Sequence, residues 1–146
     1  EVPTHIAGTL DFESGPVAST VMSFDVPAHR LPNMEIYGAE GSLAVPDPNF
    51  FKGPVLVRRL GDSEWREMPL AFGYHDNSRG IGVADMINAI RSGRPHRASS
   101  DLTYHVLEAM HGFHDASASG HYYEMQSRCD RPAPLPMGLP NNDVDG

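Results

Sequence analysis

Hydrophobic and polar positions alternate with a period of two through the first half of the chain. Ile6, Leu10 and Phe12 alternate with polar or small residues, and a second alternating run covers residues 17–26. Shorter apolar runs follow at 35–37, 43–45, 54–60 and 64–69, separated by turns rich in Gly, Pro and Asp. Strands joined by such short turns pair in antiparallel fashion. This half therefore predicts an open, mostly antiparallel β-sheet of about six or more strands.

The apolar period lengthens after Phe72, as expected for helices. Ile81, Ile87 and Ile90 fit one face of a short helix, which we expect Asn77 or Ser78 to cap and Gly93 to end. A longer helix follows, with Ser100 or Asp101 as its N-cap and Gly120 at its end. Its apolar residues recur in steps of four and three: Leu102, Val106, Ala109, Phe113 and Ala116.

Strands grouped first and helices grouped later predict an α+β fold with two helices packed on one face of the sheet. Residues 121–127 could add a closing strand. Residues 1–130 form the predicted domain, and residues 131–146, which are Pro-rich and then polar, are expected to form an extended tail.

Composition narrows the possible partners. The formal net charge of −8 argues against nucleic acid, which requires a basic surface. No run of 18 apolar residues exists, so the sequence predicts no membrane-spanning helix. Cys129 is the only cysteine, which excludes an internal disulfide and favours the reducing cytoplasm.

The alternating run at 17–26 has two usable faces. One carries Val17, Ser19, Val21 and Ser23, which are small and partly apolar. A face of this kind can be covered by a second sheet. We therefore expect a homo-oligomer, a dimer or larger, formed through the sheet face.

Several patterns suggest chemistry only weakly. Glu108, His111 and Asp115 share one helical face and could ligate a metal, although a solvent-facing polar stripe is the favoured interpretation. His114 is expected to be packed at the edge of the buried face. The Gly80-x-Gly82 pair lacks the preceding strand of a dinucleotide site. No catalytic or metal residue is assigned from these patterns.

The segment 74–79 is the main candidate for a polar ligand site. It gathers hydrogen-bonding side chains at a predicted helix N-terminus, where polar and anionic ligands bind well. A plain capping loop is an equally good interpretation. His29 and Arg30 form a second candidate, for which a solvated turn is favoured. The substrate-pocket candidates are thus Tyr74, His75, Asp76, Asn77, Arg79, His29 and Arg30.

Three ordered segments resemble the Gfo/Idh/MocA oxidoreductases, which include glucose–fructose oxidoreductase and inositol dehydrogenase. The first is the hairpin Glu35-Ile36-Tyr37-Gly38-Ala39-Glu40-Gly41-Ser42-Leu43, similar to that family's i-x-G-x-x-G-x-L signature. The second is residues 80–94, which resemble a late helix with its Gly93-Arg94 ending. The third is residues 100–120, which resemble the last helix.

The resemblance implies the later part of a C-terminal domain whose sheet builds oligomers and helps to close a pocket for a sugar, polyol or related small molecule. It also implies an N-terminal Rossmann domain that binds NAD or NADP. The Glu-Lys-Pro motif of that family is missing here, because Lys52 follows Phe50-Phe51 instead. We therefore expect this chain alone to bind no cofactor and to be inactive. A free-standing, non-catalytic self-association module and a histidine-based metal protein remain alternatives.

Overall fold

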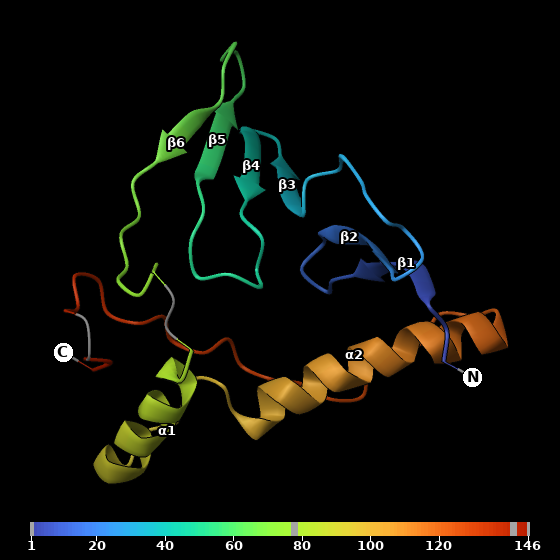
Figure 1. Ribbon diagram of the computed structural model, residues 1–146. Helices are drawn as coiled ribbons and strands as arrows, with labels where there is room; N and C mark the ends of the chain where they lie inside the picture. The colour runs from blue at the N-terminus through green and yellow to red at the C-terminus, as the bar shows by residue number, and fades with distance from the viewer. Residues whose placement is uncertain (1, 77–78, 141–142, 146) are drawn as a thin grey trace. The chain divides into compact units, whose positions relative to one another are not determined.

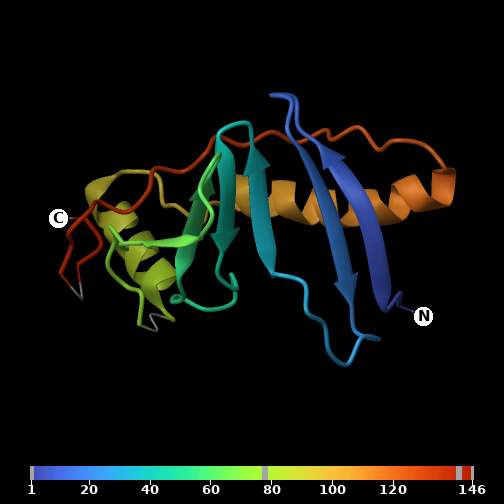
Figure 2. The same cartoon turned by 90° about the horizontal axis from the view of Figure 1, so that it is seen from above.

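The computed structural model describes residues 2–76, 79–140 and 143–145 (Figures 1 and 2). The chain divides into two compact units. The first unit comprises residues 1–30 and 99–131, and the second comprises 31–98 and 132–146. In chain order the elements are β1 (His5–Asp11), β2 (Val17–Ser23), β3 (Met34–Gly38), β4 (Gly41–Val45), β5 (Val55–Arg59), β6 (Arg66–Met68), α1 (Ile81–Ser92) and α2 (Ser100–Ser119).

The first unit is a β-hairpin packed on a helix. β1 and β2 pair antiparallel, with Gly8 opposite Thr20, and α2 contacts β1. A Cβ added to Gly8 would lie 2.7 Å from Cε1 of Phe113, so glycine lets the helix approach the strand closely. The opposite face is open, because Val17 and Val21 are 63% and 64% exposed. The alternation expected over residues 17–26 is thus present in β2, although the strand ends at Ser23.

The second unit contains a four-stranded antiparallel sheet in the order β3-β4-β5-β6. The register places Ile36 opposite Leu43 and Leu43 opposite Val57. Because side chains alternate between the faces of a strand, one face of this sheet is mainly apolar. Its apolar members are Met34, Ile36, Leu43, Val45, Val55, Val57 and Met68. α1 contacts no described strand, so α1 does not cover this face.

The hairpin between β3 and β4 depends on its second glycine. Gly41 has a φ of 154°, and a Cβ there would lie 2.4 Å from the Arg58 carbonyl oxygen of β5. Gly38 has no positive φ, and a Cβ there would meet only the Gly41 oxygen at 3.7 Å. Of the two glycines, only Gly41 therefore requires the conformational freedom of glycine.

Both helices end where the sequence predicts, at Gly93 and Gly120, which adopt left-handed conformations. Their beginnings differ from the expectation. α2 is capped by Ser99, whose Oγ accepts a hydrogen bond from the Leu102 backbone N–H, rather than by residue 100 or 101. α1 has Gly80 at its N-cap position, and the two residues expected there, 77 and 78, lie outside the described residues.

The α+β class with open antiparallel sheets is confirmed, with six strands and two helices in the described residues. The strands are distributed over two sheets, and only α2 contacts a strand. The closing strand expected at 121–127 is wrong, because these residues form no strand. Their backbone donors bind a side chain of α2 instead, as described below.

The described residues bury few apolar side chains. Only Ala89 and Val144 among them are apolar and buried, at 1% and 4% exposure. Ile87 and Ile90, expected on the buried face of α1, are 42% and 73% exposed. No helix in the described part of the chain is both long and apolar enough to cross a membrane.

Candidate functional site

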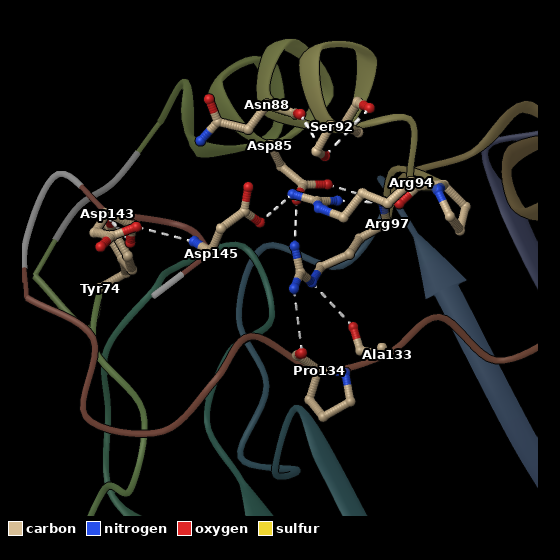
Figure 3. A network of polar contacts seen from close by, with 12 residues as sticks. Tyr74, Asp85, Asn88, Ser92, Arg94, Arg97, Ala133, Pro134, Asp143 and Asp145 are labelled. Atoms are coloured by element: carbon tan, nitrogen blue, oxygen red, sulfur yellow. Dashed lines mark hydrogen bonds and ion pairs between the residues drawn. The ribbon is translucent and has the colours of Figure 1, made fainter.

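Tyr74 is the most constrained residue of the predicted ligand loop. It lies in the second unit and has a φ of 65°, in the left-handed region. Its hydroxyl donates a hydrogen bond of 2.5 Å to the backbone carbonyl of Asp143 (Figure 3). A residue with a Cβ is strained in this conformation, so the contact with Asp143 holds a backbone geometry that the loop would not favour alone.

The other predicted residues of this loop face water. His75, Asp76 and Arg79 are exposed, and their side chains make no hydrogen bond to another described residue. Asn77 lies outside the described residues. The loop thus presents an imidazole, a carboxylate and a guanidinium that can bind a polar ligand.

His29 and Arg30 are also exposed, but they belong to the first unit. The loop at 74–79 belongs to the second unit. The two predicted groups therefore form no common site within either unit, and each is a separate candidate.

A buried carboxylate on α1 organises the residues that follow the helix. Asp85 is 4% exposed. Its Oδ1 accepts a hydrogen bond of 2.7 Å from Arg94, and its Oδ2 accepts one of 2.8 Å from the Arg97 backbone N–H. The Arg97 guanidinium also pairs with Oδ1. Burial opposes ionisation, but the hydrogen bonds from Arg97 and Arg94 outweigh it and lower the pKa of Asp85.

The two arginines also hold the C-terminal residues, which we call the C-terminal strap (residues 132–140 and 143–145). Arg97 Nε donates a 3.0 Å hydrogen bond to the carbonyl of Ala133, and Nη2 donates one of 3.4 Å to that of Pro134. Arg94 pairs with the carboxylate of Asp145 (Figure 3). Val144, which precedes Asp145 in the sequence, is buried. The expected extended tail is therefore tied back to α1.

A second buried carboxylate lies on α2, and here the sequence prediction is wrong. Glu108 was expected to face solvent but is only 9% exposed. It accepts hydrogen bonds from the backbone N–H groups of Gln126 and Ser127, at 2.7 and 2.8 Å, and from the Tyr123 hydroxyl at 3.1 Å. The Ser127 hydroxyl and the Gln126 N–H lower the pKa of Glu108 to about 2. The backbone N–H groups of Gln126 and Ser127 thus bind the Glu108 carboxylate instead of a neighbouring strand.

The remaining histidine candidates do not form a metal site. His111 and Asp115 are exposed, whereas Glu108 is buried. His114 is exposed rather than packed as expected. Among the described residues, no group of three His, Cys, Asp or Glu side chains is placed to hold a metal ion.

One hollow lies on the sheet of the second unit. It has a volume of about 450 Å³. A second hollow of about 310 Å³ lies beside it, over β5 and β6. Neither is lined by a predicted site residue. The first is lined by Ile36, Gly38, Glu40, Gly41, Ser42, Leu43, Val57 and Arg59.

Sequence reasoning missed Asp85 and its arginine partners. A signal was present, because Asp85 lies four residues from both Ile81 and Ala89 and so shares their helical face. A carboxylate there must be paired when it is buried. The partners Arg94 and Arg97 lie beyond the end of α1, so the helical periodicity gives no indication that they contact Asp85.

No family model matches the chain, and neither a curated protein nor a solved structure matches it.

Proposed function

We propose that this chain is the substrate-binding and oligomerisation domain of an NAD(P)-dependent oxidoreductase that resembles the Gfo/Idh/MocA family. Its substrate would be a sugar, a polyol or a related small molecule. The observation that carries the proposal is the order of three segments, namely the Gly38–Gly41 hairpin, the helix ending at Gly93-Arg94 and the helix ending at Gly120. The pairing of β3 with β4 and the bounds of α1 and α2 support this reading of the three segments.

The proposed division of labour places hydride transfer outside this chain. Such transfer requires a nicotinamide held against the substrate carbon, and an NAD(P)-binding Rossmann domain would supply it. The loop at 74–79 would contribute polar groups to the substrate pocket, and the lone thiol of Cys129 supports a cytoplasmic location. The chain alone is then inactive, whereas the complete enzyme oxidises or reduces its substrate with NAD or NADP.

The pocket assignment is tested by substituting Arg79 in the complete enzyme. A charged hydrogen bond to substrate is lost in Arg79→Ala, so KM should rise about tenfold. Arg91→Ala removes an exposed arginine of α1 that has no hydrogen bond to a described residue, and it should leave KM unchanged. Equal KM values for both variants and the unsubstituted enzyme would remove Arg79 from the pocket.

Oligomerisation is proposed to use the open face of β1 and β2, which carries the exposed side chains of Val17 and Val21. Exposed apolar patches commonly mark protein–protein contacts. Val21→Glu places a charge on this face and should convert a dimer into a monomer in light scattering. Val26→Glu, in the following loop, is the matched control. A chain that is monomeric at high concentration before any substitution would contradict this assignment.

The alternative is a free-standing, non-catalytic module that self-associates. The mainly apolar face of the β3–β6 sheet favours it as much as it favours an oligomeric enzyme. The two are distinguished by whether a dinucleotide-binding domain is encoded in the same reading frame, which only the enzyme requires.

A further inference from the structure

Tyr74 is the only non-glycine residue with a positive φ in the described part of the chain. A strained conformation of this kind persists only where the surroundings hold it, and such residues cluster at switch regions. The contact that holds Tyr74 comes from the far end of the chain, where Asp143 accepts its hydroxyl hydrogen bond. The conformation of the ligand loop therefore depends on docking of the C-terminal strap.

The charged side chains that hold the strap differ in how far they are exposed to solvent. The Asp85 side chain is 5% exposed, whereas those of Arg94 and Asp145 are 26% and 34% exposed. Exposed ion pairs are screened by salt, and buried ones much less. The pair between Arg94 and Asp145 is therefore the weakest charged contact in the cluster. Asp145 directly follows Asp143 and Val144 in the sequence, so this pair holds the segment that contacts Tyr74.

We infer that the C-terminal strap is a salt-sensitive latch that sets the conformation of residues 74–76. With the Arg94–Asp145 pair closed, Val144 is buried and the Asp143 carbonyl holds Tyr74 in its left-handed conformation. When the pair opens, Asp143 moves away and Tyr74 relaxes to an ordinary conformation. The exposed side chains of His75 and Asp76 then change position with the loop.

The latch concerns the loop that the proposed function assigns to the substrate pocket, and in that sense it builds on that function. Its test measures cleavage of the backbone by a protease and needs neither substrate nor cofactor. Failure of the latch would leave the pocket assignment of Arg79 intact, and failure of that assignment would leave the latch intact.

The test is limited chymotrypsin digestion of the full chain, which reports opening of the loop as cleavage after Tyr74. Cleavage after Tyr122, an exposed residue of the first unit, provides the internal reference. Asp145→Asn should raise the ratio of the two rates about two- to fivefold at low salt, the effect of a partly exposed ion pair. Val144→Asp, which would bury a charge, should raise it about tenfold or more. Asp130→Asn makes the same charge change without a hydrogen bond or ion pair to a described residue and should have no effect.

Two further measurements test the latch, namely the salt dependence of the cleavage ratio and the effect of substituting Tyr74. High salt should raise the ratio in the unsubstituted chain toward that of Asp145→Asn and should leave Asp145→Asn itself unchanged. Tyr74→Phe keeps the cleavage site but removes the hydroxyl, so it should raise the ratio and be less than additive with Asp145→Asn. Circular dichroism checks that Val144→Asp retains its helices. The latch is overturned if Asp145→Asn leaves the ratio unchanged, or if salt acts equally on both chains.

Discussion

In the first unit α2 lies against β1, whereas in the second unit α1 contacts no described strand and is tied instead to the C-terminal strap. Both helices nevertheless carry a buried carboxylate that holds a later segment of the chain. Asp85 is satisfied mainly by two guanidinium groups, and Glu108 by backbone N–H groups and a hydroxyl. A buried carboxylate thus holds a later segment in both units, through charged partners in the second unit and through neutral hydrogen-bond donors in the first.

This difference predicts different sensitivities. An ion pair has two charges that depend on each other, so removing one leaves the other without its partner. A carboxylate bound by N–H groups leaves only neutral donors behind when it is removed. The second unit should therefore respond more strongly than the first to loss of its carboxylate, and it should also respond to salt.

The largest expected effect comes from Asp85→Ala, which leaves Arg94 and Arg97 without their shared partner. We expect the free energy of unfolding of the second unit to fall by about 3 kcal/mol, in the range for broken buried pairs. Urea denaturation measures it, with hydrogen exchange of the α1 amides identifying the unit. Asp115→Ala, at an exposed position of α2, should change stability by less than about 0.5 kcal/mol. Equal losses in both variants would contradict a structural role for Asp85.

In the first unit the packing of α2 on β1 is broken by Gly8→Ala. The added methyl group would overlap the Phe113 ring, so the free energy of unfolding should fall by about 1–3 kcal/mol. Gly82→Ala is the matched control, because nothing lies within 4 Å of a Cβ there. In a helix this change should be stabilising by about 0.5–1 kcal/mol. A neutral Gly8→Ala would mean that α2 does not pack closely on β1.

A smaller and more local effect is expected from Glu108→Gln. The amide group offers one neutral acceptor oxygen in place of two charged ones. Neither the Gln126 nor the Ser127 N–H group then has a charged acceptor, and one of them loses its acceptor altogether. Their hydrogen exchange should become about tenfold faster, since hydrogen bonds to charged groups are the stronger ones. Glu124→Gln makes the same change at an exposed position. If both variants exchange equally fast, Glu108 does not hold this segment.

The smallest effect is the acid dependence of the same contact. The pKa of Glu108 is lowered from 4.5 to about 2. A lowered folded pKa contributes stability that is fully present above 4.5 and is lost as pH falls toward 2. The difference in unfolding free energy between the unsubstituted chain and Glu108→Gln should therefore shrink across this range. A difference that stays constant between these pH values would show that the carboxylate charge is not what stabilises the contact.

The local elements were largely predictable from sequence. Alternation located β1 and β2, and the glycines at 93 and 120 ended both helices where left-handed caps were expected. These features depend on neighbouring residues only, which is why pattern was sufficient. The left-handed conformation of Tyr74 could not be predicted, because its hydrogen-bond partner Asp143 is distant in sequence.

The contacts that define each unit were not predictable, since their partners are distant in sequence and include backbone atoms. A helical wheel places Glu108 opposite the apolar face of α2, and only the return of residues 123–127 buries it. Arg94 likewise meets Asp145, which is 51 residues away. A polar tail carries no periodicity that indicates where it docks.

We propose that these two units belong to an NAD(P)-dependent oxidoreductase, and the reading frame upstream of Glu1 tests this proposal most directly. We predict that sequencing finds, in frame, a strand followed by Gly-x-Gly-x-x-Gly and, further on, a Glu-Lys-Pro motif. A stop codon or a promoter immediately before Glu1 would contradict the claim and favour a free-standing self-association module.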